Sequence, residues 1–188
     1  MEKKMDPRII RTRKLIMDSF IQLSTKKSLK ELTIKDITDE ATVNRATFYY
    51  HFNDKYDLLE KVLKEDLMTN VIQEIDQQDQ LDHETITAIF LSITSFQTSL
   101  ASRCKRSFEE FTSSIETVIK KELEQAFYRI LLAQHPDQDK QSLRIGAVML
   151  SWGIYGAAVD WREHSDTAPE EYIKVVVPYM TGEIALKP

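Results

Sequence analysis

Hydrophobic residues recur at intervals of three and four along most of the 188-residue chain, which places them on one face of a helix. The pattern predicts helices over residues 7–25, 34–41, 45–52, 55–76, 84–100, 108–134, 139–164 and 170–180. Four glycines, five prolines and no run of alternating Val, Ile and Thr disfavour a sheet. We therefore expect an all-α chain of about nine helices, with an N-terminal three-helix head and a C-terminal helical bundle as its body.

Two short helices within residues 32–55 are each preceded by a side chain that can cap them. Thr33 can accept hydrogen bonds from the free amides of the first helix, with Asp36 at its third position. Asn44 can cap the second helix in the same way. Because the connector, residues 41–43, is so short, the two helices must cross. This arrangement predicts a helix-turn-helix.

The second of these helices carries an unusual outward face. Phe48 and Phe52 point inward, which leaves an outer surface made of Arg45, Ala46, Thr47, Tyr49, Tyr50 and His51. A helix that is merely solvated more often carries Glu, Lys and Gln. Thr and Ala can pack on a thymine methyl, Arg can reach guanine, and Tyr and His can bond phosphate oxygens. The pattern favours a DNA-reading helix over the alternative, a small helical core whose aromatic residues spill onto its surface.

The run T-I-K-D-I-T-D-E-A-x-V-N-R-x-T-F-Y-Y-H-F-x-D-K-Y-D-L-L, residues 33–59, resembles the N-terminal DNA-binding domain of the tetracycline-repressor (TetR/AcrR) family of bacterial transcriptional regulators. The resemblance covers about the first third of the chain. It implies that the helix from Arg45 is the recognition helix, and that His51, a tyrosine and Lys55 contact phosphates. The residues we expect at DNA are Thr33, Lys35, Asn44, Arg45, Ala46, Thr47, Tyr49, Tyr50, His51 and Lys55.

Two positions depart from the family pattern. The family usually has Gly in the turn where Thr42 stands, and often another near Lys27 or Ser28. A β-branched residue tolerates positive φ poorly. We therefore expect the turn at Thr42 to carry strain or to follow a different backbone path.

Charge is distributed unevenly between the two parts of the chain. Residues 1–64 hold 14 Lys and Arg against 10 Asp and Glu, whereas residues 65–188 hold 11 against 20, which accounts for the net charge of −5. Six of the basic residues fall within residues 1–14. The asymmetry is typical of a DNA-facing head on a body that phosphate would repel, although charge also fluctuates along chains without such a role.

The helix predicted over residues 55–76 would link head and body as one continuous rod. In the family the corresponding helix transmits the ligand signal to the head. We therefore expect residues 1–54 to form the DNA-binding domain and residues 55–188 the ligand-binding and dimerisation domain.

Small residues concentrate in the segment 139–164, which holds three of the four glycines. Since Gly costs about 1 kcal/mol against Ala inside a helix, their presence indicates close helix packing. Family resemblance implies that the last two helices pair with their copies in a four-helix bundle; packing within one chain is the alternative. The expected interface residues are Gly146, Met149, Gly153, Ala157, Trp161, Tyr172 and Val176, with a kink at Pro178.

The body also carries many large apolar side chains. Any one of them is more readily explained as core, but in the family such residues line an inducer pocket, and the candidates here are Phe96, Phe108, Phe111, Met149, Trp152 and Tyr155. The expected partners are double-stranded DNA, a second copy of the chain and a small apolar or amphipathic effector. A body that binds a protein partner instead, as in an adaptor, is the alternative.

No motif in the chain points to catalysis. We find no activated nucleophile pair, no metal-ligand spacing among the histidines and no Gly-rich phosphate loop, so we expect neither an enzyme nor a cofactor nor a metal site. The longest apolar stretch, residues 147–159, is too short and too interrupted to predict a membrane span. A single cysteine, Cys104, suits a reducing cytoplasm, as a buried apolar residue rather than a redox sensor. The prediction is a cytoplasmic homodimeric regulator, a repressor, that binds a palindromic operator.

Overall fold

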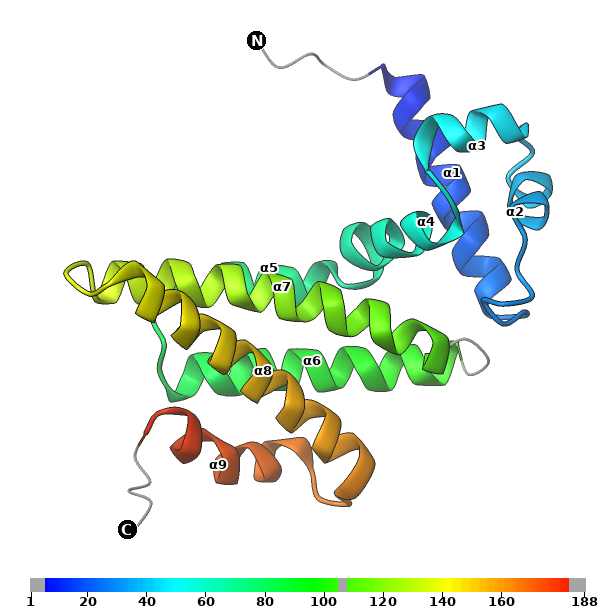
Figure 1. Cartoon of the computed structure of the whole chain (residues 1–188). Coiled ribbons are helices and arrows are strands. Elements are labelled where there is room, and N and C mark those ends of the chain that lie inside the picture. The colour runs from blue at the N-terminus through cyan, green and yellow to red at the C-terminus, as the bar shows by residue number, and fades with distance from the viewer. Residues whose placement is uncertain (1–5, 105–107, 183–188) are drawn as a thin grey trace. The chain divides into compact units, whose positions relative to one another are not determined.

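The computed structural model describes residues 6–104 and 108–182, without the side chains of Leu67 and Arg103 (Figure 1). Every regular element in these ranges is helical. In chain order the elements are α1 (Pro7–Ser24), α2 (Ile34–Glu40), α3 (Arg45–His51), α4 (Lys55–Val62), the π-helix η1 (Leu63–Leu67), α5 (Thr69–Asp76), α6 (His83–Arg103), α7 (Phe108–Gln134), α8 (Lys140–His164) and α9 (Pro169–Met180). The predicted all-α fold, with a helix-turn-helix head and a helical body, is confirmed.

The chain divides into two compact units. The first comprises Met1–Leu67 with Leu100–Ile115, and the second comprises Met68–Ser99 with Glu116–Pro188. By packing, α4 and η1 belong with the head, so the first unit extends past residue 54. The functional roles given to the two parts stay predictions.

The head forms around large side chains from several helices. Phe20 of α1, Phe48 of α3 and Leu58 of α4 are almost fully buried, and Phe20 stacks on Phe111 with the ring centroids 6.3 Å apart. The start of α1 is as predicted, because the Asp6 side chain accepts a hydrogen bond from the Arg8 amide at 2.8 Å. Figure 1 shows α2 and α3 crossing beside α1, which is the helix-turn-helix geometry.

The turn between α2 and α3 closes with the backbone of Thr42 at φ 53°. The Thr42 amide donates to the carbonyl of Asp39 at 3.2 Å, and the Val43 amide donates to the carbonyl of Thr38 at 3.0 Å. This pair of bonds is a Schellman motif, which places its left-handed residue directly after the helix cap. The sequence predicted either strain or a different backbone path at this turn. The structure keeps the ordinary backbone path, and the turn is strained because a β-branched residue occupies a left-handed conformation.

The prediction of one continuous helix over residues 55–76 is wrong. The helix changes to π winding at Leu63, and Met68 separates η1 from α5. Leu63 and Met68 are both fully buried, and in an unbroken α-helix two residues five positions apart would point about 140° away from each other. The looser winding of a π-helix, which bonds residue i to i+5, brings them closer to one side. The apolar spacing therefore reflects the π segment.

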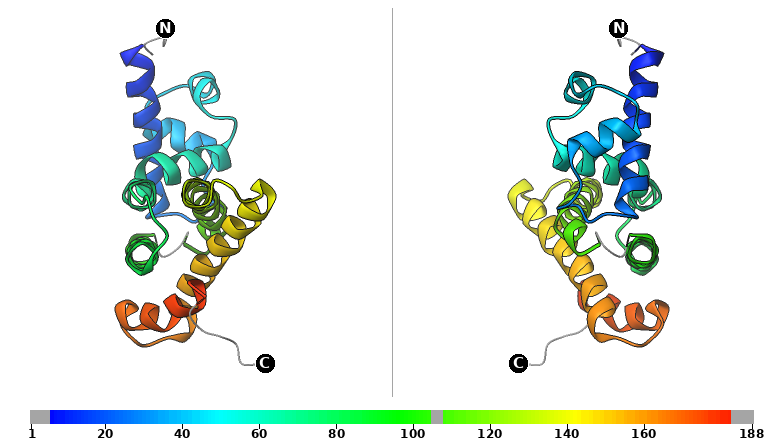
Figure 2. Two further views of the ribbon diagram at one scale, coloured as in Figure 1. Left: turned by 90° about the vertical axis from the view of Figure 1, so that its left-hand side faces the viewer. Right: turned by 90° about the vertical axis from the view of Figure 1, so that its right-hand side faces the viewer.

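The second unit contains α5, α8, α9 and most of α6 and α7, whose adjoining ends belong to the first unit. Its helix boundaries match the predicted ones within a few residues, and Asp139 caps α8 by accepting from the Ser142 amide at 2.8 Å. Figures 1 and 2 show α6 and α7 running antiparallel, with α8 crossing them obliquely and α9 returning beside α8. Pro178 lies inside α9, which ends two residues later.

Within the described ranges, α8 is the one helix long and apolar enough to cross a membrane, with a mean hydropathy of 1.3 over 18 residues. A third of that window is buried in the chain itself. The core helix of a soluble protein passes the same test, so the expectation of no membrane partner rests on the sequence alone.

Candidate nucleic-acid interface

The helix α3, the predicted recognition helix, is fixed at both ends by local contacts. At its start the Asn44 Oδ1 accepts from the Thr47 amide at 2.8 Å and from the Thr47 hydroxyl at 3.0 Å. At its end Phe52 is buried, and the Phe48 ring lies 5.8 Å from it. These anchors hold the opposite face of α3 in solvent.

That outward face has the composition expected from the sequence. The Tyr49 and Tyr50 side chains are 52% and 68% exposed, Arg45 and Ala46 are exposed, and Thr47 and His51 are half-buried. The predicted orientation of α3 is therefore confirmed. Its contact with DNA stays a prediction.

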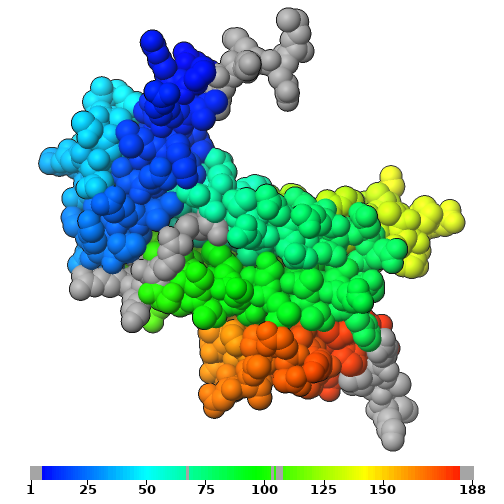
Figure 3. Space-filling model, turned by 180° about the vertical axis from the view of Figure 1, so that it is seen from behind, coloured from blue at the N-terminus to red at the C-terminus, as the bar shows by residue number. Residues whose placement is uncertain are grey.

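A hollow of about 420 Å³ adjoins this face. Its walls come from both α3 and the first turns of α1, namely Arg8, Ile9, Thr12, Asn44, Ala46, Thr47, Tyr50 and His51. Figure 3 shows the blue start of α1 next to the cyan surface of α3. The three α1 residues were not among the predicted site residues. The basic excess of residues 1–14 was the signal that pointed to them.

Thr33 and Lys35 lie on the exposed side of α2, but both have local partners. The Thr33 hydroxyl oxygen accepts from the Asp36 amide at 3.1 Å, and the Thr33 amide donates to the Asp36 carboxylate at 2.9 Å, which completes the predicted capping box. Lys35 pairs with Asp39 at 2.8 Å. The Lys27 ammonium, followed by the Thr33 donors, lowers the pKa of Asp36 well below its usual range. Asp36 therefore stays a carboxylate, and it holds the entry to α2.

Lys55 makes contacts that the sequence did not reveal. Its ammonium donates to the carbonyl oxygens of Leu29 at 2.8 Å, Leu32 at 2.9 Å and Lys30 at 3.4 Å. An ammonium has three donors, so these bonds engage all of them. They fasten the loop between α1 and α2 to the start of α4. The expected phosphate contact stays a prediction. It would require the Lys55 ammonium to be shared between these carbonyl oxygens and a phosphate.

His51, the last residue of α3, is half-buried. Burial, and secondarily the nearby Arg13 guanidinium, lower the pKa of His51 below its ordinary value. At neutral pH the ring is therefore uncharged and has one N–H donor. It suits a hydrogen bond to a phosphate oxygen rather than an ion pair.

The six candidate effector residues do not all fall in one compact unit. Phe108 and Phe111 belong to the first unit, and Phe96, Met149, Trp152 and Tyr155 belong to the second. Trp152 is 58% exposed, and the Lys120 ammonium lies 3.2 Å from the centroid of its ring. Tyr155 is buried. Of the four in the second unit, Met149 and Trp152 thus lie on the surface.

The candidate interface residues on α8 and α9 split between internal packing and exposure. A Cβ on Gly146 would lie 3.5 Å from Leu131, and a Cβ on Gly153 would lie 3.6 Å from Met180. Trp161 and Tyr172 have polar partners within the chain, in the Thr167 carbonyl and Asp160. Ala157 and Val176 are half-buried, and Met149 is exposed. At Gly146 and Gly153 an added Cβ would therefore make ordinary van der Waals contact within the chain, and their place in an interface stays a prediction.

A further group of large apolar side chains projects from the same two helices. They are Ile145, Met149 and Trp152 on α8, with Val175 and Tyr179 on α9. Beside them, a Cβ on Gly156 would meet nothing within 4 Å. We call these five side chains the apolar face. Exposed apolar surface of this kind is typical of an association site.

Two further observations concern other chemistry. Cys104 is buried, as expected. In the ranges that the structure covers, no group of three His, Cys, Asp or Glu residues could hold a metal ion.

Two sequence comparisons concern the N-terminal part of the chain. Residues 16–62 match the model of the bacterial regulatory proteins of the tetR family. Over 64 residues the chain is 38% identical to the uncharacterized HTH-type transcriptional regulator YxbF of Bacillus subtilis strain 168. The match covers 34% of this chain and only 17% of that relative's length.

The fold comparisons extend over almost the whole chain. A TetR transcriptional regulator from Streptococcus agalactiae 2603V has a TM-score of 0.62 and 21% identity over 92% of this chain and 95% of its own. DhaS, an activator of a dihydroxyacetone kinase operon, has a TM-score of 0.55 and 16% identity, covering 93% and 97%. At these identities the likeness shows the fold.

Proposed function

We propose that this chain, whose residues 16–62 match the tetR-family model and whose fold is similar to that of a TetR regulator, is a DNA-binding transcriptional regulator of that family that places α3 in the major groove. The observation that carries the proposal is the outward face of α3. Its two tyrosines are more than half exposed although they stand between buried Phe48 and Phe52. Exposure of these tyrosines to water does not stabilise the fold. Their hydroxyl groups and the neighbouring polar side chains can instead contact base edges and phosphates.

Each side chain of that face has a distinct chemical use. The Thr47 hydroxyl is engaged by Asn44, so its methyl group is the part offered to a thymine. Arg45 is exposed at the first position of α3 and suits guanine. Tyr50, the more exposed of the two tyrosines, can contact a base or the sugar–phosphate backbone. Arg8 and Thr12 line the adjoining hollow and suit the flanking phosphates.

We further propose that two copies associate through the apolar face of α8 and α9. One recognition helix reads only a few base pairs, each worth about 1–3 kcal/mol of discrimination. Two heads related by a two-fold axis would read a palindrome with half-sites about 34–36 Å apart. The exposed apolar face supports this association, since water contact is unfavourable for side chains of that size.

Control by a small effector in the second unit is supported by two buried polar side chains. Gln97 is 1% exposed, and neither atom of its amide has a hydrogen-bond partner. The Tyr155 hydroxyl is likewise buried without a partner, and burial raises the pKa of Tyr155 to about 12. Buried polar groups are normally hydrogen-bonded. An effector with its own donors and acceptors would satisfy these groups, and we propose repression relieved by such an effector as the mode of control in the cytoplasm.

The direct test is selection of bound duplexes from a random library by the purified full-length chain, followed by footprinting on the selected site. The expected result is an inverted repeat protected on one face of the duplex. Failure to enrich any sequence, with affinity that does not distinguish the pool from random DNA, would contradict the proposal. Reporter assays on the selected site then distinguish repression from activation. The fold does not decide between them, because DhaS, which has a similar fold, is an activator.

The adaptor hypothesis shares the DNA-binding head but assigns a different occupant to the apolar face. Its supporting observation is the same exposed set of side chains on α8 and α9. Sedimentation distinguishes the two: a dimer at micromolar concentration supports association between copies, whereas a monomer supports a different protein partner.

A further inference from the structure

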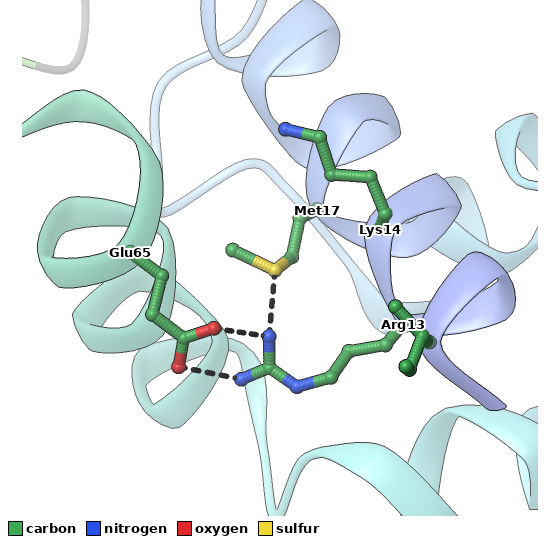
Figure 4. Close-up of a pocket in the computed structure, with 5 residues that line it drawn as sticks. Arg13, Lys14, Met17 and Glu65 are labelled. Atoms are coloured by element: carbon green, nitrogen blue, oxygen red, sulfur yellow. Dashed lines mark hydrogen bonds and ion pairs between the residues drawn. The ribbon is translucent and has the colours of Figure 1, made fainter. Parts of the chain in front are cut away.

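Arg13 lies at the meeting point of three elements of the head. Its guanidinium forms a two-pronged ion pair with Glu65 of η1, in which Nη2 donates to Oε1 at 2.8 Å and Nη1 donates to Oε2. Nη1 also donates to the Met17 sulfur at 3.0 Å. Figure 4 shows Arg13 reaching from α1 to Glu65 with Met17 beside it. Such paired geometry fixes a guanidinium more firmly than a single contact does.

The same guanidinium also touches the end of the recognition helix. Its Cζ lies 5.1 Å from the centroid of the Phe52 ring, and Phe52 caps α3. Its positive charge also acts on His51, the last residue of α3. A cation over an aromatic face is attracted to it. Arg13 therefore connects η1 to the C-terminal end of α3 through a single side chain.

The next residue along each element makes a parallel pair that does not reach α3. Lys14 donates to Asp66 at 2.7 Å and lies 3.0 Å from Asp18 on its own helix. Two consecutive cations of α1 thus face two consecutive acids of η1. Since a π-helix is wound more loosely than an α-helix, rewinding η1 would turn Glu65 and Asp66 relative to α1. Both ion pairs depend on the π winding.

We propose that Arg13 is a positioning residue that fixes the C-terminal end of α3, and that the π-helix η1 holds it in place through Glu65. Arg13 thereby acts on DNA affinity through α3, without itself contacting the duplex. Arg13 orients α3 rather than binding phosphate, because its charge is already paired with the Glu65 carboxylate. η1 is the last element of the first unit before the chain continues into the second. A change in its winding would move Glu65, and through Arg13 it would alter the position of the end of α3. The part of the proposal that concerns DNA rests on the proposed function.

The test compares two matched variants of the full-length chain, Glu65→Gln and Asp66→Asn. Each neutralises one acid of η1 and removes its ion pair with α1, and both change the net charge equally; Lys14 keeps Asp18 as a partner. Only the first affects the side chain that touches α3. The measurements are affinity for the selected duplex and for a scrambled duplex over a range of salt, and the amide NMR shifts of residues 49–52 without DNA.

We expect Glu65→Gln to weaken binding to the selected duplex about fivefold per head, the change that corresponds to about 1 kcal/mol for a well-formed exposed pair. Binding to the scrambled duplex should not weaken, and the amide signals of residues 49–52 should move. Asp66→Asn should do neither. Arg13→Lys, which keeps the charge but loses the two-pronged geometry, should behave as Glu65→Gln does.

Two results would overturn the proposal. One is an equal response of both variants in affinity and in the NMR shifts. The other is tighter binding of Glu65→Gln to both duplexes, which would mean that the released guanidinium reaches phosphate. If Glu65→Gln fails to fold, Arg13→Lys, which keeps the cation at position 13, is compared with Asp66→Asn instead. If the wild-type chain selects no duplex, the proposed function fails, and the NMR comparison alone decides whether Arg13 positions α3.

Discussion

The ammonium of Lys55 lies 2.9 Å from the carbonyl oxygen of Leu32 and joins the start of α4 to the loop that precedes α2. Two more carbonyls of the same loop accept from it. A residue that the family resemblance assigns to DNA is therefore also part of the scaffold of the head. The two roles predict different consequences when it is replaced.

Replacement of Lys55 by Met should destabilise the chain by about 1–3 kcal/mol, because backbone carbonyls of the loop would lose their donor. The measurement is the urea midpoint and slope of unfolding. Glu60→Ala, at an exposed position on the same helix, is the control and should change stability little. An unchanged midpoint for Lys55→Met, together with a shallower salt dependence of DNA binding, would assign Lys55 to phosphate alone.

Thr42→Gly should stabilise the chain by about 1 kcal/mol. A left-handed conformation costs a β-branched residue about 1–3 kcal/mol, and the greater freedom of Gly in the unfolded chain offsets part of that gain. Thermal unfolding and urea titration measure the difference. Thr42→Ala, which keeps a Cβ at the same φ, should gain much less. A destabilised Thr42→Gly variant would show that the Thr side chain makes a compensating contact.

Tyr50→Ala and Thr47→Ala should alter which sequence is bound. Tyr50→Ala should leave stability within about 0.5 kcal/mol, since exposed positions contribute little to folding. Each good base contact is worth about 1–3 kcal/mol of discrimination. Repeating the duplex selection with each variant checks the prediction. The expected result is relaxed preference at one or two positions of each half-site, and an unchanged selected sequence for both variants would reject the docking of α3.

Arg13→Met should raise the pKa of His51 toward its ordinary value, although burial would still hold it lower. Titration of the His51 ring signals by NMR gives both values directly. The sign for stability follows from the depressed pKa. The folded chain binds the His51 proton less readily than the unfolded chain does. The stability that neutral His51 contributes is therefore complete above its unfolded pKa near 6.5, and it is lost as the pH falls through its pKa in the folded chain. His51→Gln should therefore reduce the loss of stability between pH 7 and pH 5.

Gly156→Leu should weaken association between copies at least about tenfold if the apolar face is the dimer interface, because the site has room in the isolated chain but not beneath a partner helix. Analytical ultracentrifugation over a concentration series measures this. Gln141→Leu, an exposed position near the start of α8, is the control and should leave association unchanged. Equal dimerisation of both variants would place the interface elsewhere.

The parts of this structure that follow from local pattern were predictable from the sequence. The caps at Thr33 and Asn44 and the inward positions of Phe48 and Phe52 fix the helix-turn-helix, because each acts within a few residues of itself. The strain at Thr42 was also predictable, since it follows from one residue type in one kind of turn.

The parts that depend on distant pairing were not. Arg13 and Glu65 are 52 residues apart, and Lys55 binds carbonyls more than 20 residues earlier. No spacing rule connects such partners. The π-helix was missed for a related reason: its apolar residues fit a helical period well enough to suggest an unbroken helix, and only the packing of Leu63 and Met68 shows the change in winding.

Both tryptophans of the chain lie on α8, and they differ in surroundings. Trp161 is hydrogen-bonded to the Thr167 carbonyl, whereas Trp152 belongs to the apolar face and lies beneath the Lys120 ammonium. Intrinsic fluorescence excited at the indole band therefore originates wholly from this helix and not from the DNA-facing head. Covering Trp152 would shift its emission to shorter wavelength. The unlabelled protein thus carries an optical reporter of assembly, and Trp152→Phe would leave Trp161 as the reference chromophore.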